Sequence, residues 1–188
     1  MADNNSRNSG GRRDNRRDAA PAEPKLFEEV VINIDRVSRV VKGGRRFRFK
    51  ALVVVGDNKT KVGVGVAKGA DVQAAVAKAT EVAKKHMIVI PINNGTIPHE
   101  AEKKVAGAHV LIKSAAPGTG IIAGGVVRTI IGVTGIKNML SKSLGSTNKV
   151  NIAYATIDAL KSLVPREEWL NQTSKKSAAK PVVTEETK

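Results

Sequence analysis

Hydrophobic and polar residues alternate along much of the first third of the chain, as they do in a β-strand with two unlike faces. Strands are predicted over Glu29–Val41 and Phe47–Val55, on either side of the glycine pair Gly43-Gly44. Glycine adopts positive φ without steric cost, so this pair permits a tight turn. The pattern therefore predicts a β-hairpin. One face of its first strand is lined by Val30, Ile32 and Ile34.

A third strand is predicted over Lys61–Lys68, with Gly63 and Gly65 on one of its faces. Glycine weakens a strand, so two glycines on one face indicate the close approach of another backbone, either RNA or a packed helix. Apolar residues then recur at helical spacing from the predicted N-cap Asp71 to His86. The first unit is therefore predicted to be three strands covered by a helix.

The stretch Pro91–Pro98 contains turn-forming residues and is the predicted boundary between two units. Strands are predicted after it over Thr96–Val105 and Ala108–Ala115. The almost wholly apolar segment Ile121–Val133 predicts a buried helix, opened by the loop Pro117–Gly120. Neighbours are expected to pack closely against this helix at Gly124, Gly125 and Gly132.

Two further elements complete the second unit. A strand is predicted over Ile136–Leu144, with Lys137 and Lys142 exposed. A helix is predicted from Asn148 until shortly before Pro165, which cannot continue it.

The predicted organisation is an α+β fold with two small domains between disordered tails. Residues 1–25 are too poor in apolar groups to offset the entropy of folding, so they are predicted to be a disordered basic arm. This arm either lies along phosphates or is a solvated tail. The domains are predicted at residues 26–93 and 94–164, followed by a mostly disordered tail at 165–188.

Composition points to a polyanionic partner. The 188-residue chain has a formal net charge of +15 and a pI near 10.3, which attracts polyanions and makes their binding sensitive to salt. Aromatic residues make up only 3%, so the core must be aliphatic. The chain has no Cys, which excludes disulfides, thiolate metal sites and cysteine nucleophiles. Residues 1–22 are polar and Arg-rich with no apolar h-region, and no apolar run reaches about 18 residues, so we expect neither secretion nor a membrane span.

Basic residues concentrate on the predicted hairpin. Alternation places Arg46, Arg48 and Lys50 on one face, and Phe47 and Phe49 on the other, towards the core. Because the two rings then face inwards, we expect contacts with the backbone and shape of RNA rather than with its bases. The predicted RNA-binding residues are Arg36, Arg39, Lys42, Gly43, Gly44, Arg45, Arg46, Arg48, Lys50, Lys61, Lys68, Gly118, Thr119 and Gly120.

Two glycine-rich segments share the spacing Gly-x-Gly-x-x-x-Gly. They are Gly63–Gly69 and Gly118–Gly124. This spacing matches neither the dinucleotide-binding fingerprint nor the phosphate loop of nucleoside triphosphatases. The second is predicted to present backbone amides at a helix start, where the phosphate of RNA or of a nucleotide binds favourably. The histidines His86, His99 and His109 lie at no metal-ligand spacing, and no serine has an evident base. We expect no metal, no cofactor and no enzyme activity.

Five stretches of sequence point to a protein family more specifically than the composition does. They are DRVSRVVKGGRRFRFKALVVVGD (35–57), KVGVGVAKG (61–69), NNGTIPH (93–99), PGTGIIAGGVVR (117–128) and GSTNKVNIAYATIDAL (145–160). In this order, over about residues 26–163, they resemble the S-five family of bacterial small-subunit ribosomal proteins. Both ends of the chain carry no motif of that family.

The resemblance implies an N-terminal domain like a double-stranded-RNA-binding fold without its first helix, and a C-terminal βαβ-type α/β sandwich. It implies a structural constituent of the small ribosomal subunit in the cytoplasm. Such a protein binds the small-subunit ribosomal RNA, contacts proteins of the S-four and S-eight families, lies near the messenger RNA entrance and influences decoding accuracy.

The resemblance also implies roles for single residues. Arg36 and Arg45 would be cations on the side of the messenger or of the ribosomal RNA. Val37, Ser38 and Arg39, with the Lys42–Arg46 loop, would form the region whose changes give spectinomycin resistance. The segment between Gly120 and Arg128 would lie towards the S-four contact.

Two other functions stay open at this point. One is an enzyme of the kinase-like fold that uses Pro117–Gly125 as a phosphate loop, although kinship of fold does not carry chemistry with it. The other is a free RNA chaperone with the same basic face.

Overall fold

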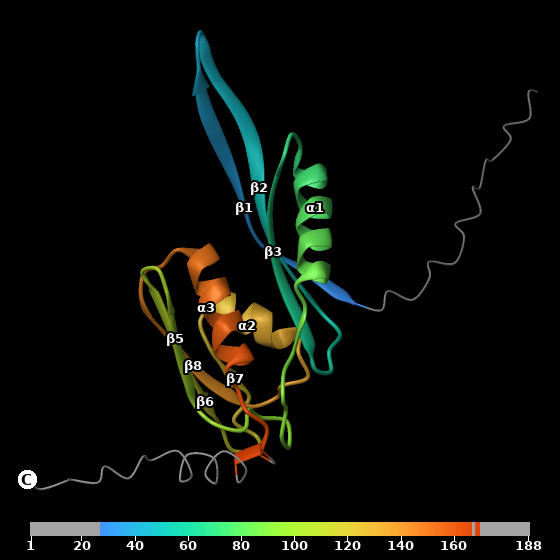
Figure 1. Ribbon diagram of the computed structural model, residues 1–188, viewed down its shortest axis with the longest axis vertical. Coiled ribbons are helices and arrows are strands. Elements are labelled where there is room, and N and C mark those ends of the chain that lie inside the picture. The colour runs from blue at the N-terminus through green and yellow to red at the C-terminus, as the bar shows by residue number, and fades with distance from the viewer. Residues whose placement is uncertain (1–26, 167, 170–188) are drawn as a thin grey trace, which may run out of the picture.

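The computed structural model describes residues 27–166, 168 and 169. Figure 1 shows two sheets with helices, and a long hairpin that projects from the first sheet. In chain order the elements are β1 (Glu28–Val41), β2 (Gly44–Gly56), β3 (Lys61–Gly69), α1 (Val72–Lys85), β4 (Ile88–Val89), β5 (Ala101–Val105), β6 (Ala108–Ser114), β7 (Ile121–Ile122), α2 (Gly125–Gly132), β8 (Met139–Gly145) and α3 (Lys149–Lys161).

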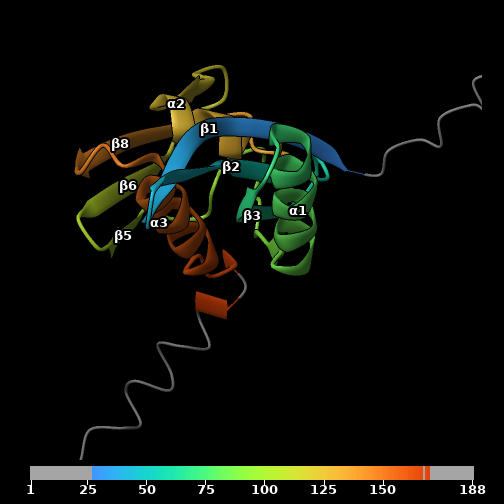
Figure 2. The same ribbon diagram turned by 90° about the horizontal axis from the view of Figure 1, so that it is seen from above.

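The first sheet is antiparallel, in the order β1-β2-β3-β4, and α1 covers one of its faces (Figures 1 and 2). Alternation along β2 gives the sheet two apolar faces. Ala51, Val53 and Val55 pack in one cluster with α1, whereas Leu52 and Val54 belong to a second cluster on the opposite side. The predicted hairpin and the helix that follows it are therefore confirmed.

Gly63 and Gly65 of β3 lie on the side of α1. A Cβ atom at Gly65 would collide with the backbone oxygen of Ala79, and one at Gly63 with that of Ala83. The backbone that approaches these glycines is therefore a packed helix, which decides between the two alternatives that the sequence left open.

The second sheet has the order β5-β6-β8-β7. β7 and β8 are parallel neighbours, and α2 connects them, so β7-α2-β8 is a βαβ unit. The chain is thus an α+β protein with a sheet and helix in its N-terminal part and a second sheet-helix unit in its C-terminal part, as predicted.

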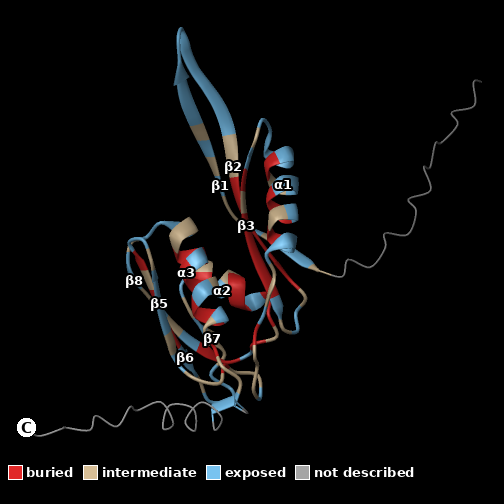
Figure 3. Cartoon of the chain, viewed as in Figure 1, coloured by how far each residue is buried: buried red, intermediate tan, exposed pale blue. Residues whose placement is uncertain are grey.

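The two helices α2 and α3 lie between the two sheets (Figure 1). One continuous cluster of buried side chains joins Leu52 and Val54 of the first sheet to Val110 and Ile112 of the second, with Leu160 of α3 among them. Figure 3 shows this buried interior and the exposed hairpin that extends beyond it. The two sheets therefore share one core, which fixes the base of the hairpin relative to the second sheet.

The turn between β2 and β3 is hydrogen-bonded, backbone to backbone, to the segment that follows α2. The amide of Asn58 donates a hydrogen bond to the carbonyl of Val133 at 3.1 Å. Asp57 holds the turn, because its Oδ1 accepts three backbone N–H groups at 2.8 to 2.9 Å. Burial acts to raise the pKa of Asp57, but the hydrogen bonds from Lys61 and its neighbours outweigh burial and hold the pKa below its ordinary value.

The predicted face of the first strand is wrong for one of its three residues. The register between β1 and β2 shifts between Val31 and Asn33, so a β-bulge lies at Ile32. Val30 and Ile32 pack against the shared core, but Ile34 is 44% exposed. The extra residue in the bulge moves the side chains after it to the opposite faces of the strand from those that strict alternation predicts.

The predicted buried helix over residues 121–133 is only partly correct. Its first two residues pair with β8 as strand β7, and α2 begins at Gly125. The expected close packing at Gly124, Gly125 and Gly132 is wrong, because a Cβ atom at each would meet nothing within 4 Å. The predicted strand over Thr96–Val105 is also shorter, since β5 begins at Ala101.

No helix in the described part of the chain is long and apolar enough to cross a bilayer. The predicted disordered arm, and most of the predicted tail, fall outside the described residues. The predicted boundary between the domains at residues 93 and 94 stays a prediction.

Replacing Gly65 by Ala is expected to lower the free energy of unfolding by about 1–3 kcal/mol, because the new methyl group forces α1 away from β3. Gly132→Ala on α2 is the matched control, since its methyl group meets only open space. Urea unfolding of both variants measures the difference. Equal stability of the Gly65→Ala and Gly132→Ala variants would show that α1 does not pack closely against β3 at Gly65.

Candidate nucleic-acid interface

The β1/β2 ladder sorts the side chains of the hairpin onto two faces. Val37 lies opposite Arg48 and Arg39 opposite Arg46, so these residues share one face. We call it the groove face. Its members beyond the core are Val37, Arg39, Val41, Arg46 and Arg48, continued by Lys68 on β3. The opposite side, which continues towards α1, is the α1 face. It carries Arg36, Ser38, Arg45, Phe47 and Phe49.

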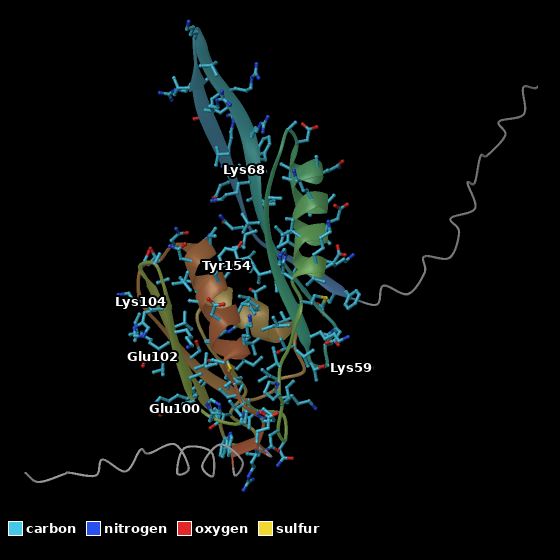
Figure 4. All side chains as sticks on the ribbon, in the orientation of Figure 1. Lys59, Lys68, Glu100, Glu102, Lys104 and Tyr154 are labelled. Atoms are coloured by element: carbon cyan, nitrogen blue, oxygen red, sulfur yellow. The ribbon has the colours of Figure 1, made fainter. Side chains whose placement is uncertain are left out.

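The groove face contains a hollow of about 250 Å³. Arg46, Arg48 and Lys68 line it together with Arg39, and Val37, Ser38 and Val41 complete the lining. Figure 4 shows Lys68 beside the base of the hairpin. The structure therefore gathers four of the predicted RNA-binding cations around one concave surface.

These four cations are available to an outside anion. In the described residues, none of the ion pairs involves Arg39, Arg46, Arg48 or Lys68. All four are exposed. A surface with several unpaired cations around a hollow favours a partner that carries a row of negative charges.

Lys50 differs from the other predicted cations, because it already has a carboxylate partner. Its Nζ lies 2.8 Å from Oδ2 of Asp35 on the neighbouring strand. The hydrogen bond from Lys50, with a second one from Asn33, holds the pKa of Asp35 below its ordinary value. The pair marks the base of the hairpin, where the free cations of the groove face begin.

Phe47 does not face the core, so its predicted position is wrong. Phe47 is 47% exposed, and the Arg36 guanidinium carbon lies 3.9 Å from the centroid of its ring. Only Phe49, which is partly buried, packs against the α1 cluster. Alternation placed both rings correctly on one face, but the core ends before that face reaches Phe47.

The tip of the hairpin is a bare glycine turn. Gly43 and Gly44 have φ values of 85° and 156°, and a Cβ atom at either would meet nothing within 4 Å. The backbone of the tip is thus open to a large partner. Lys42 precedes the turn and is exposed.

The structure does not bring Lys61 to this surface. Lys61 begins β3 and Lys68 lies near its other end, so the two are about 23 Å apart along an extended strand. By the register of β3, Lys61 also points to the opposite face from Lys68. It lies two residues after Lys59, which Figure 4 shows far from Lys68. Any contact of Lys61 with RNA would be separate from the groove face.

The glycine loop at Gly118–Gly120 is not the helix start that the sequence predicted. The amides of Gly118 and Gly120 both donate to Oδ1 of Asn138, at 3.1 and 3.0 Å. α2 begins only at Gly125. Two of the amides expected to hold a phosphate are therefore already satisfied within the protein, and the roles of Gly118, Thr119 and Gly120 in RNA binding stay predictions without that basis.

Arg128 lies on the exposed side of α2. The glycines Gly124, Gly125 and Gly132, one turn before and after it, leave its surroundings open. Gly120 has a positive φ of 74° and open space beside it. Both residues predicted to face another protein are thus near exposed, glycine-rich backbone.

Comparison with protein families gives two matches. Residues 27–91 match the family model described as ribosomal protein S5, N-terminal domain, and residues 103–173 match that of ribosomal protein S5, C-terminal domain. The chain belongs to the ribosomal protein S5 family. It is therefore a structural protein of the small ribosomal subunit, and the family is not an enzymatic one.

The matches place the features described above within the S5 domains. The hairpin, with both of its faces, lies in the N-terminal S5 domain, and Asn138 with its glycine loop lies in the C-terminal one. The part of the chain that the structure describes contains no group of three His, Cys, Asp or Glu residues that could hold a metal ion.

Sequence reasoning missed two residues that shape these sites. Asn138 closes the glycine loop from 18 and 20 positions away, and no local pattern indicates such a partner. Lys149, at the start of α3, donates from Nζ to Oδ1 of Asn33 at 2.8 Å and so ties α3 to β1 below the hairpin. Only the bulge in β1, which the alternation did not reveal, turns Asn33 to that side.

Asn138→Ala in this S5 protein should lower the free energy of unfolding by about 1–3 kcal/mol, because two loop amides lose their acceptor. Asn138→Asp keeps an acceptor oxygen in the same place and is the matched control. Chemical unfolding measures both. If the Ala variant were as stable as the unaltered protein, the side chain would not be what holds the loop.

Proposed function

We propose that this S5 protein binds the small-subunit ribosomal RNA with its hairpin, and that Arg39, Arg46, Arg48 and Lys68 on the groove face neutralise its phosphates. The observation that carries this proposal is the hollow lined by four exposed cations without carboxylate partners. Phosphate contacts position a protein on RNA without reading its sequence. Val37 and Val41 line the same hollow as the four cations, so a folded RNA backbone in it would meet both charge and apolar surface.

The remaining parts of the proposal rest on the family resemblance. Lys42, Gly43 and Gly44 at the tip would reach furthest into the RNA, because open backbone there allows close approach. Arg36 and Arg45 on the α1 face would lie towards messenger RNA at its entrance. Val37, Ser38 and Arg39 would form the spectinomycin-resistance region. These roles would tie the hairpin to decoding accuracy in the cytoplasmic small subunit.

Protein partners are proposed for the C-terminal domain. The exposed, glycine-rich side of α2 with Arg128, and Gly120 nearby, would face a protein of the S-four family. A protein of the S-eight family is a further proposed neighbour. Lys50 and Lys61 are weaker candidates for RNA contact than the groove-face cations, since Lys50 is paired and Lys61 lies apart.

The test is the salt dependence of binding to a transcript of the small-subunit ribosomal RNA. Arg46→Gln with Arg48→Gln should lower the slope of log K against log salt by about two, because two phosphate contacts are lost. Lys78→Gln with Lys85→Gln removes the same charge from the exposed side of α1 and should leave the slope within about 0.5 of the unaltered protein.

Equal losses in both double variants would mean that only net charge attracts the RNA, and would overturn the assignment to the groove face. A nearly flat salt dependence of the unaltered protein would count against phosphate binding altogether. Far-ultraviolet circular dichroism checks that both variants stay folded, which is expected because all four replaced side chains are exposed.

A further inference from the structure

Phe47 and Arg36 form a stacked pair on the α1 face of the hairpin. The guanidinium carbon of Arg36 lies 3.9 Å from the ring centroid, and Phe47 as a whole is 47% exposed. A planar cation held on an aromatic ring loses little conformational freedom when something stacks on it. The pair is therefore a flat surface, already oriented, on a part of the chain with no core beneath it.

The position of this pair is not explained by packing. Phe49, two residues further along β2, packs against the α1 cluster, but that cluster does not include Phe47. The β2 residues from Gly44 to Arg48 are all exposed. About half of the Phe47 surface stays open to solvent although Arg36 lies on its ring, so the pair can also contact a partner outside the chain.

The neighbours of the pair favour a nucleotide as that partner. Arg45 lies on the same face of β2, two residues from Phe47, and so about 7 Å along the strand. This spacing is close to that between a nucleobase and the phosphate of its own nucleotide. A flat aromatic and guanidinium surface with a cation beside it can stack a base and hold its phosphate together.

We infer that Phe47 and Arg36 form a stacking site for an unpaired nucleobase, with Arg45 on the phosphate of that nucleotide. This inference rests on the proposed RNA binding and adds a second contact to it. The groove face holds one length of RNA backbone through charge, and the α1 face holds an unpaired base by stacking. The hairpin thus lies between two RNA segments, and the second contact requires a base that is not paired.

The test compares two single-stranded probes with the same number of phosphates, a 15-residue oligoadenylate and an abasic oligomer of equal length. The full-length protein is expected to bind the oligoadenylate about tenfold more tightly, because only that probe can stack. Phe47→Leu keeps an apolar side chain and should remove most of this preference, while the salt dependence of binding stays unchanged.

Two further variants separate stacking from charge. Arg36→Lys keeps the positive charge but removes the planar guanidinium group. It should therefore reduce the preference for oligoadenylate over the abasic oligomer, as Phe47→Leu does. Arg48→Gln, on the groove face, should weaken the binding of both probes equally and lower the slope of log K against log salt by about one.

If Phe47→Leu and Arg36→Lys keep the full preference for oligoadenylate, the stacking site is wrong, and the pair serves the hairpin itself or a protein contact. That result leaves the groove face intact, because the salt slope and its loss in Arg48→Gln report on the phosphate contacts separately. Circular dichroism of both variants shows whether the hairpin has been lost, and a folded variant with unchanged preference is the outcome that overturns the site.

Discussion

The β1/β2 ladder is longer than the core that supports it, and the rest of the structure depends on this difference. Every residue of β2 from Ala51 to Gly56 is buried, and none from Gly44 to Lys50 is. Beyond Ala51 the two strands hold each other, and an isolated two-stranded hairpin is only marginally stable in water. The cations on it also repel one another. A bound polyanion would remove that repulsion. The cluster of cations that destabilises the free hairpin therefore also makes the hairpin suited to binding RNA.

The body of the protein supplies a firm base for this arm. On one side α1 lies so close to β3 that only glycine fits at Gly65, and on the other side the sheet shares its core with α2 and α3. The Asp35–Lys50 ion pair and the hydrogen bond from Lys149 to Asn33 fix the strands where they leave the core. The arm therefore departs from a defined place at a defined angle, with a phosphate-binding hollow on one face and a stacked ring on the other.

Local pattern was enough to predict most of this architecture, and the errors have physical causes. Alternation and a glycine pair located the hairpin, and the glycine face of β3 indicated a close backbone. Alternation also placed Phe47 on the correct face, but it cannot tell how far a core extends beneath a strand. Ile34 was misplaced because a bulge adds one residue, and the glycine loop was misread because its acceptor, Asn138, is remote in sequence. The concave arrangement of Arg39, Arg46, Arg48 and Lys68 depends on strand register, which the sequence does not state.

The most direct measurement is amide hydrogen exchange of the full-length protein, free and bound to the small-subunit ribosomal RNA. If the hairpin is an arm completed by RNA, amides of residues 36–48 exchange rapidly in the free protein and become protected on binding. Amides of β3 and of residues 51–55 are protected in both states. Strong protection of residues 36–48 without RNA, or no change there on binding, would contradict the claim that RNA completes the hairpin.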